Sequence, residues 1–247
     1  MAERMTSEPD SQNARRMAGM TRRSLLVGGA AALASGAIWE WIRTRRLDNG
    51  VPWPLRAGLN ADEELTRDYF SETRLVRTFP PDAAQAGRPN GSIGIEDDLD
   101  PDWKLHFGDL KLGLDDIRAL PKTVMTTELK CIEGWSRIIR WGGARFSDFV
   151  ARYYDGAPDA DQYVALETPD GDYYVGLDMA SAMHPQTLLC YEMNGKPLES
   201  QHGAPLRLVV PLKYGIKNLK RIGKIDFSDS RPKDYWAERG YDWYAGF

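Results

Sequence analysis

The sequence is poor in the two residue types that most often hold structural metals and disulfides. Only two cysteines occur among its 247 residues, at positions 131 and 190, so a single bridge is open to the chain but a disulfide framework is not. The three histidines, at positions 106, 184 and 202, lack the spacing by which a helix presents paired metal ligands. A zinc site built on histidine is therefore disfavoured.

Concentrated positive charge and long apolar runs are also scarce. The net charge is −4, and no basic cluster comparable to that of the first 46 residues follows it, which argues against nucleic acid as a partner. The small, apolar run near the N-terminus spans residues 27–38 and is stopped by Glu40, so it falls short of the ~20 residues of a comfortable membrane span. With 42% hydrophobic and 28% charged residues, the chain has the composition of a globular protein with one sizeable core.

The N-terminus has the layout of a twin-arginine export signal. Arg22-Arg23 precedes the apolar run, and small residues near the end of that run would suit cleavage after Ala34 or Ala37. The tryptophans and arginines at positions 39–46 favour instead a retained membrane anchor, and a chance arginine pair before an alanine-rich helix is the plain alternative. We assign residues 1–41 to an export signal or anchor. Because this pathway carries folded proteins, the signal hints at a cofactor that is loaded before export.

The patterns after the signal predict an extended arm over residues 42–100 and a main domain over residues 101–247. The arm is rich in proline and weakly periodic, with a short helix expected at 62–70 and a strand at 75–79. In the main domain, the patterns predict strands at 105–107, 163–168, 173–177, 188–193 and 206–210, and helices at 114–120, 146–154 and 178–183.

Two local signals refine this prediction. Ser147 is placed to cap the helix expected at 146–154. Asn194-Gly195 after the fourth expected strand is the strongest two-residue signal for a hairpin turn. The aromatic-rich segment 235–247 is expected to pack back on the body of the domain.

Cys131 follows a run with the alternation of a half-buried strand. Every second residue from Met125 to Cys131 falls on one face, and Gly134 with Trp135 predicts a tight, well-packed turn directly afterwards. A thiolate at the end of a rigid strand suits a soft transition metal. The other interpretation is that Cys131 is a small buried hydrophobic residue.

Five basic residues between positions 213 and 224 surround Gly215. Such a run is usually a solvated face. The functional interpretation is a phosphate pocket, in which backbone N–H groups of a glycine-containing turn act together with lysine.

Several blocks of sequence, in this order, carry a likeness to a known family: Cys131 to Trp135, Tyr163 to Thr168, Tyr191 to Leu198, His202 to Pro211, Lys213 to Gly215 and Lys217 to Lys220. On these blocks the chain resembles the molybdopterin domain of the sulfite oxidase family. Within that family it is most similar to the exported bacterial branch that includes periplasmic protein-methionine-sulfoxide reductases. The resemblance implies an α+β fold of mixed β-sheets and short helices in a single domain.

The resemblance also implies the site, residue by residue. Cys131 matches the catalytic cysteine that ligates molybdenum in a molybdenum–molybdopterin cofactor. Tyr174 matches an active-site tyrosine, although the residues after it depart from that motif. The N-terminal asparagine and aromatic motif of the exported branch is not found in residues 47–100, where Asn90-Gly91 is a candidate stand-in for it. The positions that match cofactor contacts are Thr168, His202, Arg207, Asn218, Leu219 and Lys220.

The activity implied by the resemblance is oxygen-atom transfer, with reduction of an S-oxide or N-oxide by electrons from a membrane cytochrome b-type partner. A sulfite dehydrogenase that passes electrons to a soluble cytochrome c is the alternative. His202 and Tyr174 favour this alternative. Eukaryotic sulfite oxidases have histidine where the sulfoxide reductase has asparagine, and Tyr174 matches the active-site tyrosine of sulfite oxidases. The intact Cys131 disfavours a non-catalytic pterin-binding module. The sequence lacks a haem-binding Cys-x-x-Cys-His motif, so electrons come from or pass to another protein. With the export signal, this implies a periplasmic or exported protein.

Overall fold

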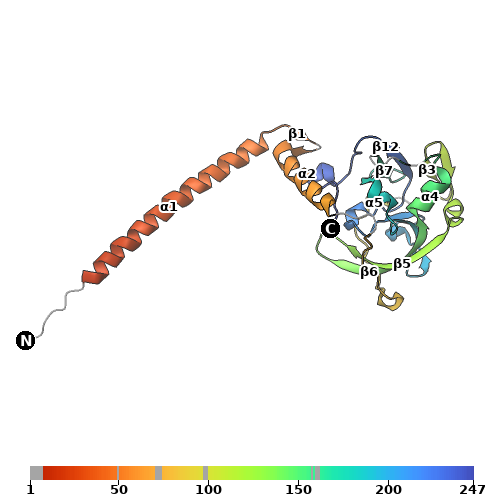
Figure 1. Ribbon diagram of the computed structural model, residues 1–247, viewed down its shortest axis with the longest axis horizontal. Coiled ribbons are helices and arrows are strands. Elements are labelled where there is room, and N and C mark those ends of the chain that lie inside the picture. The colour runs from red at the N-terminus through yellow and green to blue at the C-terminus, as the bar shows by residue number, and fades with distance from the viewer. Residues whose placement is uncertain (1–7, 49, 70–73, 97–99, 157, 159–161) are drawn as a thin grey trace, which may run out of the picture. The chain divides into compact units, whose positions relative to one another are not determined.

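The structure is a computed structural model (Figure 1). It describes residues 8–48, 50–69, 74–96, 100–156, 158 and 162–247. Contacts divide the chain into two compact units, one of residues 1–48 and 52–56 and the other of residues 49–51 and 57–247.

The first unit is built on one long helix, α1 (Glu8–Arg43), drawn in red and orange in Figure 1. Its stretch Thr21–Arg43 has 23 residues and a mean hydropathy of 1.5, and by length and composition it is able to cross a membrane. The expectation that the apolar run is too short for a span was wrong, because the helix continues through Glu40. The Glu40 carboxylate accepts a hydrogen bond from Arg43 Nη2 at 2.8 Å, which pairs its charge within the helix. A signal sequence passes the same test of length and composition.

The arm contains a longer helix than its sequence predicts. Two short strands, β1 (Leu47–Asp48) and β2 (Val51–Pro52), precede α2 (Trp53–Asp68). The helix expected at 62–70 therefore begins earlier, because Pro54 falls in the first turn, where its missing N–H removes no helical hydrogen bond. Phe70, the expected end, lies outside the described residues.

The strand expected at 75–79 is reduced to a single bridge. Thr78 pairs with Thr127, and Phe79 N donates to Thr126 O at 2.9 Å. The chain then enters the 3₁₀ helix η1 (Pro81–Ala83). Pro80 and Pro81 have no N–H to donate, so they cannot continue the ladder beyond Phe79.

One antiparallel sheet carries the predicted cysteine strand. Its order is β10-β9-β6-β5, and β11 also pairs with β9. The strands are β5 (Lys122–Lys130), β6 (Ser136–Arg145), β9 (Leu188–Met193), β10 (Lys196–Pro197) and β11 (Arg207–Val209). The turn between β9 and β10 has positive φ at both Asn194 (54°) and Gly195 (77°), so the predicted two-residue hairpin is confirmed.

The second sheet is mixed. Its order is β4-β3-β12-β7-β8, in which β12 runs parallel to β3 and the other pairs are antiparallel. The strands are β3 (Leu105–Phe107), β4 (Leu110–Leu112), β7 (Tyr163–Glu167), β8 (Tyr174–Asp178) and β12 (Lys224–Ser228). The expected α+β class with mixed sheets and short helices is confirmed.

Three short helices complete the body: α3 (Leu114–Arg118), α4 (Phe146–Tyr153) and α5 (Met179–Met183). Ser147 does not cap α4, because the helix begins at Phe146 and Arg145 occupies the cap position. Asp178 caps α5 by accepting a hydrogen bond from Ser181 N. The 3₁₀ helices η2 (Ser200–His202), η3 (Gly215–Lys217) and η4 (Ala237–Arg239) lie in the loops that follow.

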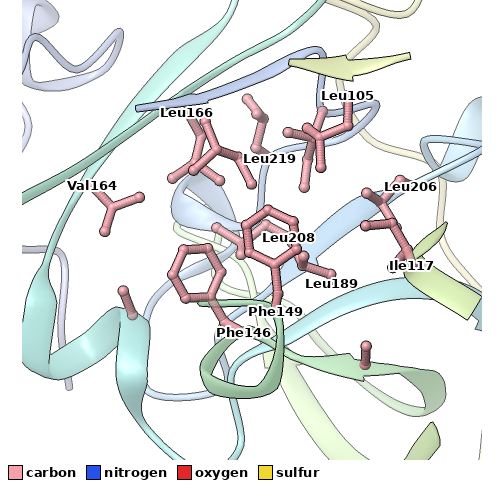
Figure 2. Packing of buried hydrophobic residues seen from close by; sticks show 14 of the residues in the cluster. Leu105, Ile117, Phe146, Phe149, Val164, Leu166, Leu189, Leu206, Leu208 and Leu219 are labelled. Carbon is pink, nitrogen blue, oxygen red and sulfur yellow. The ribbon is translucent and has the colours of Figure 1, made fainter. Parts of the chain in front are cut away.

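The main core lies where α4 and side chains of both sheets meet (Figure 2). Phe146 and Phe149 of α4 pack there with Leu166 of β7 and Leu208 of β11. Each of these four side chains is fully or almost fully buried. Burial of aliphatic and aromatic surface on this scale fixes the two sheets against each other and holds the loops at their edges in place.

Candidate functional site

Cys131 lies in a rigid turn between β5 and β6. Its N–H donates to Trp135 O at 2.9 Å, and its carbonyl accepts from Gly134 N at 3.1 Å. Gly134 has φ +85°, a left-handed conformation that glycine adopts without steric cost. The half-buried strand and the tight turn expected from the sequence are both confirmed. The Cys131 thiol is free and partly exposed.

A cavity of about 220 Å³ opens beside this thiol. Its walls come from loop 87–93, from the Cys131 turn with adjoining parts of β5 and β6, from the loops around η2 and η3, and from the C-terminal segment. Segments far apart in the sequence thus contribute side chains to one space. The predicted site residues that line it with Cys131 are His202, Arg207, Asn218 and Lys220.

Tyr174 lies away from this cavity. Its hydroxyl donates to Glu238 Oε2 at 2.5 Å, and its ring lines a separate hollow of about 270 Å³ beside Glu167 and Lys224. Tyr173 lines the thiol cavity instead. Successive side chains in an extended chain point to opposite faces, so an offset of one residue exchanges the two tyrosines. A catalytic role for Tyr174 at Cys131 does not fit this placement.

Two further predicted cofactor contacts lie outside the cavity lining. Thr168 is buried at the end of β7, where its hydroxyl hydrogen-bonds to Asp170 and to the carbonyl of Tyr173. The Leu219 side chain is fully buried in the main core (Figure 2), while its carbonyl accepts from Leu208 N at 2.8 Å. Both residues position the chain beside the site rather than facing it.

Arg207 is the buried cation of the site. Its Nη1 donates to His202 O at 2.9 Å and its Nη2 to Asn218 O at 3.3 Å, and the guanidinium lies 4.9 Å from the centre of the Trp141 ring. Its Nε has no hydrogen-bond partner among the described residues. Burial lowers the pKa of Arg207 to about 10, so it remains charged at neutral pH. Because the side chain lines the cavity, its charge would favour an anion bound there.

Lys220 joins the cavity to loop 87–93. Its Nζ donates to Asn90 O at 2.7 Å and to Gly91 O at 2.9 Å. Burial, with repulsion from Arg207 as the smaller cause, lowers its pKa to about 8. A nearby anion would favour the charged form and oppose this shift.

His202 is buried against the same loop. Burial is the main reason that its pKa is lowered, and Arg207 and Lys220 lower it further. The imidazole is therefore neutral at neutral pH, with one N–H donor and one acceptor nitrogen. A Cβ atom at Gly87 would lie 2.8 Å from this ring, so only glycine lets the loop approach it so closely.

Asn90 makes a contact with the thiol itself. Its Nδ2 lies 3.5 Å from Cys131 Sγ, within the range of a hydrogen bond to sulfur. Asn90 also lines the cavity, where the sequence offered it as a stand-in for an N-terminal asparagine motif. Its position beside the sulfur supports that interpretation.

The basic run is neither a solvated face nor, as a whole, a phosphate pocket. Lys213 and Lys217 are buried and pair with Asp178 (3.4 Å) and Asp234 (2.5 Å). Lys220 lines the cavity, and the other four basic residues of the run do not belong to its lining. The sequence of the basic run does not show which of its lysines are buried in ion pairs and which line the cavity, because the acidic partners come from other segments.

Sequence reasoning missed much of the cavity's aromatic and basic lining: Arg88, Arg137, Trp141, Tyr173, Trp236 and Tyr241. The aromatic content of segment 235–247 was a signal that the segment packs back, and it does, with Trp243 and Tyr244 buried. Nothing in the local pattern distinguishes core aromatics from those that face the cavity.

The donor set fits a molybdenum–pterin cofactor. Cys131 offers a soft thiolate for a metal, and the cationic side chains of Arg207 and Lys220 line the same cavity, where they favour an anionic group. Within the described residues, no three His, Cys, Asp or Glu side chains gather as a metal site. A metal on Cys131 would therefore take its other ligands from the bound cofactor.

Comparison with known proteins agrees with this assignment. Residues 93–236 match the family described as oxidoreductase molybdopterin binding domain. A protein of Azospira oryzae, provisionally named protein-methionine-sulfoxide reductase subunit YedZ1, is 40% identical over 91% of this chain and 86% of its own length. The protein-methionine-sulfoxide reductase catalytic subunit MsrP of Campylobacter jejuni is 36% identical over 91% of this chain and 80% of its own.

The fold is also that of a solved relative. The sulfane dehydrogenase SoxCD of Paracoccus pantotrophus superposes with a TM-score of 0.50 over 65% of this chain and 46% of its own, at 20% identity. At that identity the likeness concerns the fold alone. The family match covers more than half of the chain and includes Cys131 and every predicted cofactor contact. The chain belongs to the family of oxidoreductase molybdopterin-binding domains, as its resemblance to the sulfite oxidase family led us to expect.

Proposed function

We propose that this protein is an exported molybdenum–molybdopterin enzyme that reduces an S-oxide to the thioether. The observation that carries the proposal is the free thiol of Cys131 at a cavity whose other donors are Asn90, His202, Arg207 and Lys220. The names of the Azospira and Campylobacter relatives support the choice of an S-oxide.

Each residue has a distinct role in this proposal. Cys131 would hold the metal, and Asn90 would orient its sulfur through the amide N–H. Arg207 and Lys220, with Asn218 beside them, would hold the anionic part of the pterin. Neutral His202 would hydrogen-bond the cofactor without adding charge. Thr168 and Leu219 fix the strand and loop that position these groups.

When bound, the cofactor supplies two-electron oxygen-atom transfer. The net reaction consumes an S-oxide, two electrons and two protons, and it yields a thioether and water. The walls include the apolar side chains of Ile93, Ile132 and Ile216, which would limit the contact of water with a bound substrate. The chain has no haem-binding motif, so we place the electron source in a cytochrome partner, of the membrane b type in the main proposal.

We also infer the cellular arrangement. Residues 1–41 would direct export, and α1 would either be removed or retained as an anchor, since its apolar stretch is long enough to span a membrane. The arm (42–100), which contains α2, would then lead into the molybdopterin domain (101–247), with loop 87–93 of the arm completing the cavity.

Sulfite oxidation is the second candidate. The rat mitochondrial sulfite oxidase is 31% identical over 60% of this chain and 33% of its own length, and His202 matches the histidine of eukaryotic sulfite oxidases. The placement of Tyr174 outside the cavity removes one of the two residues that favoured this reaction. S-oxide reduction therefore remains the main proposal.

Metal and pterin analysis of the purified full-length protein tests the proposal. We expect near-stoichiometric molybdenum and pterin, and reduction of methionine sulfoxide by a reduced viologen dye in preference to oxidation of sulfite. Cys131→Ser should fold but lose turnover, whereas Cys190→Ala, which removes the buried thiol of β9, should keep it. Protein from a molybdenum-replete host that contains neither metal nor pterin, or wild-type turnover by Cys131→Ser, would overturn the proposal.

A further inference from the structure

The C-terminal segment places two aromatic rings at the cavity. Trp236 and Tyr241 both line it, with ring centres 5.2 Å apart and planes at 77°. Tyr241 keeps 40% of its surface exposed, and Trp236 is half-buried. Their edge-to-face arrangement is favourable and leaves an apolar surface toward the space beside Cys131. We call these two residues the aromatic wall.

A buried ion pair holds the aromatic wall in place. Lys217 Nζ lies 2.5 Å from Asp234 Oδ2, and both side chains are almost completely buried. The other oxygen of Asp234 accepts from Trp236 N at 3.2 Å and from Ala237 N at 3.1 Å. Asp234 therefore fixes the backbone that carries Trp236, through bonds that are strong because they are charged and shielded from water.

The aromatic wall is also joined to the rest of the cavity. The Tyr173 hydroxyl donates to Ile216 O at 2.6 Å, and both residues line the cavity. A side-chain hydrogen bond links Trp236 to Tyr173, although burial still raises the pKa of that hydroxyl above its usual value. The wall is thus a built surface with fixed neighbours.

The chemistry of this surface favours one kind of substrate. Aromatic rings bind thioether-type sulfur and apolar groups favourably, and neither ring carries a charge that would bind a compact anion. A substrate with an apolar arm would bury that arm against the wall while its S-oxide group lies at the metal that Cys131 would hold. Dimethyl sulfoxide and sulfite carry no such arm.

We propose that Trp236 and Tyr241 determine specificity, by selecting S-oxides whose sulfur carries an aromatic or long apolar arm. This inference rests on the proposed function and names two residues that the family likeness does not assign. Because the wall contacts the arm and not the reacting sulfur, its contribution is the same for bound substrate and transition state. Such uniform binding appears in KM and leaves kcat unchanged.

The test uses the holoenzyme with a reduced viologen dye and two substrates, methyl phenyl sulfoxide and dimethyl sulfoxide. In Trp236→Ala and Tyr241→Ala, the ratio of KM for methyl phenyl sulfoxide to KM for dimethyl sulfoxide should rise about tenfold, which corresponds to about 1.4 kcal/mol. Trp236→Phe, which keeps an aromatic ring, should bring this KM ratio most of the way back to the wild-type value. Phe247→Ala, which removes an exposed aromatic of the same segment outside the cavity lining, is the control and should not change it. An unchanged ratio in both wall variants would overturn the inference.

A binding measurement separates this inference from the proposed function. Without a reductant, the oxidised holoenzyme should bind methyl phenyl sulfoxide in a calorimetric titration, with a Kd about tenfold higher in Trp236→Ala than in the wild type. If the wild type reduces neither of these sulfoxides nor methionine sulfoxide, the proposed function is wrong, and the titration still decides whether the wall binds the arm. Equal Kd values in wild type and Trp236→Ala would show that the aromatic wall does not bind the arm of the substrate.

Discussion

The amide nitrogen of Asn90 lies 3.5 Å from the sulfur of Cys131, although 41 positions separate the two residues in the sequence. The contact exists because Lys220, from a third segment, holds the carbonyls of Asn90 and Gly91. Three segments are thus joined through Asn90, which contacts Cys131 with its side chain and Lys220 with its carbonyl. Each of these contacts can be removed separately, which makes the arrangement open to test.

Asn90→Ala should lower kcat/KM for methionine sulfoxide about tenfold without loss of fold. A hydrogen bond to a charged group contributes about 1.5–3 kcal/mol, and the thiolate would lose this donor. The measurement is steady-state kinetics of the molybdenum-loaded enzyme, normalised to metal content. Ser92→Ala, in the same loop but bonded to Glu96, is the matched control. Equal kinetics of Asn90→Ala and wild type would show that the contact is incidental.

Lys220→Met should reduce the content of bound pterin and expose loop 87–93 to exchange. The substitution keeps the aliphatic stem but removes the charge and the two bonds to Asn90 and Gly91. Pterin released from the purified protein and hydrogen exchange of the loop are the two readouts. Lys224→Met, which removes an exposed lysine paired with Asp226, should change neither. Full pterin content with a protected loop in Lys220→Met would contradict the assignment.

Gly87→Ala should destabilise the protein by steric conflict. The new methyl would lie 2.7 Å from Met193 Cε and 2.8 Å from the His202 ring, and overpacking of this kind costs about 1–3 kcal/mol. Gly58→Ala in α2 has no atom within 4 Å of the added Cβ and should stabilise the helix, by roughly 0.5–1 kcal/mol. Urea denaturation of both variants measures the difference. Effects of the same sign would contradict the close approach of the loop to His202.

The free energy of unfolding should rise with pH above neutrality because of Lys213. Burial lowers the pKa of this lysine from 10.5 to about 7, despite the carboxylate of Asp178 at 3.4 Å. Between these pH values the unfolded chain holds a proton that the folded protein has released, so raising the pH disfavours unfolding. The free energy of unfolding increases by at most about 1.4 kcal/mol per pH unit. Below pH 7 this dependence disappears, because Lys213 is protonated in both the folded and the unfolded state.

Lys213→Met isolates this contribution. Denaturation at pH 7, 8 and 9 should give the wild type a steeper rise than the variant, while Lys196→Met, at an exposed position of β10, should follow the wild type. Parallel profiles for wild type and Lys213→Met would mean that Lys213 keeps its proton throughout this range.

Much of the fold is visible in the sequence because its signals are local. The strand before Cys131 and the Asn194-Gly195 turn each depend on a few neighbouring residues, and both are confirmed, although Met125, Thr126 and Thr127 are all buried and do not alternate. The start of α2 was missed because prolines were taken as evidence against a helix, although a proline in the first turn is compatible with one.

The site was harder to predict from the sequence because it depends on contacts between distant segments. A one-residue offset exchanges Tyr173 and Tyr174 between faces, and only packing selects between them. Lys213 and Lys217 look like surface residues until Asp178 and Asp234 are brought beside them. The aromatic wall is likewise fixed by Asp234, whose role no short-range pattern indicates.

The bonds from Lys220 to Asn90 and Gly91 span 130 and 129 positions, so the cavity cannot exist in a partly folded chain. A ligand that fills this cavity binds the native state and not the unfolded one. By mass action it raises the melting temperature by an amount set by its concentration and affinity. Thermal melting of a purified preparation would then report how much of it carries the cofactor, with empty and loaded molecules melting as two populations.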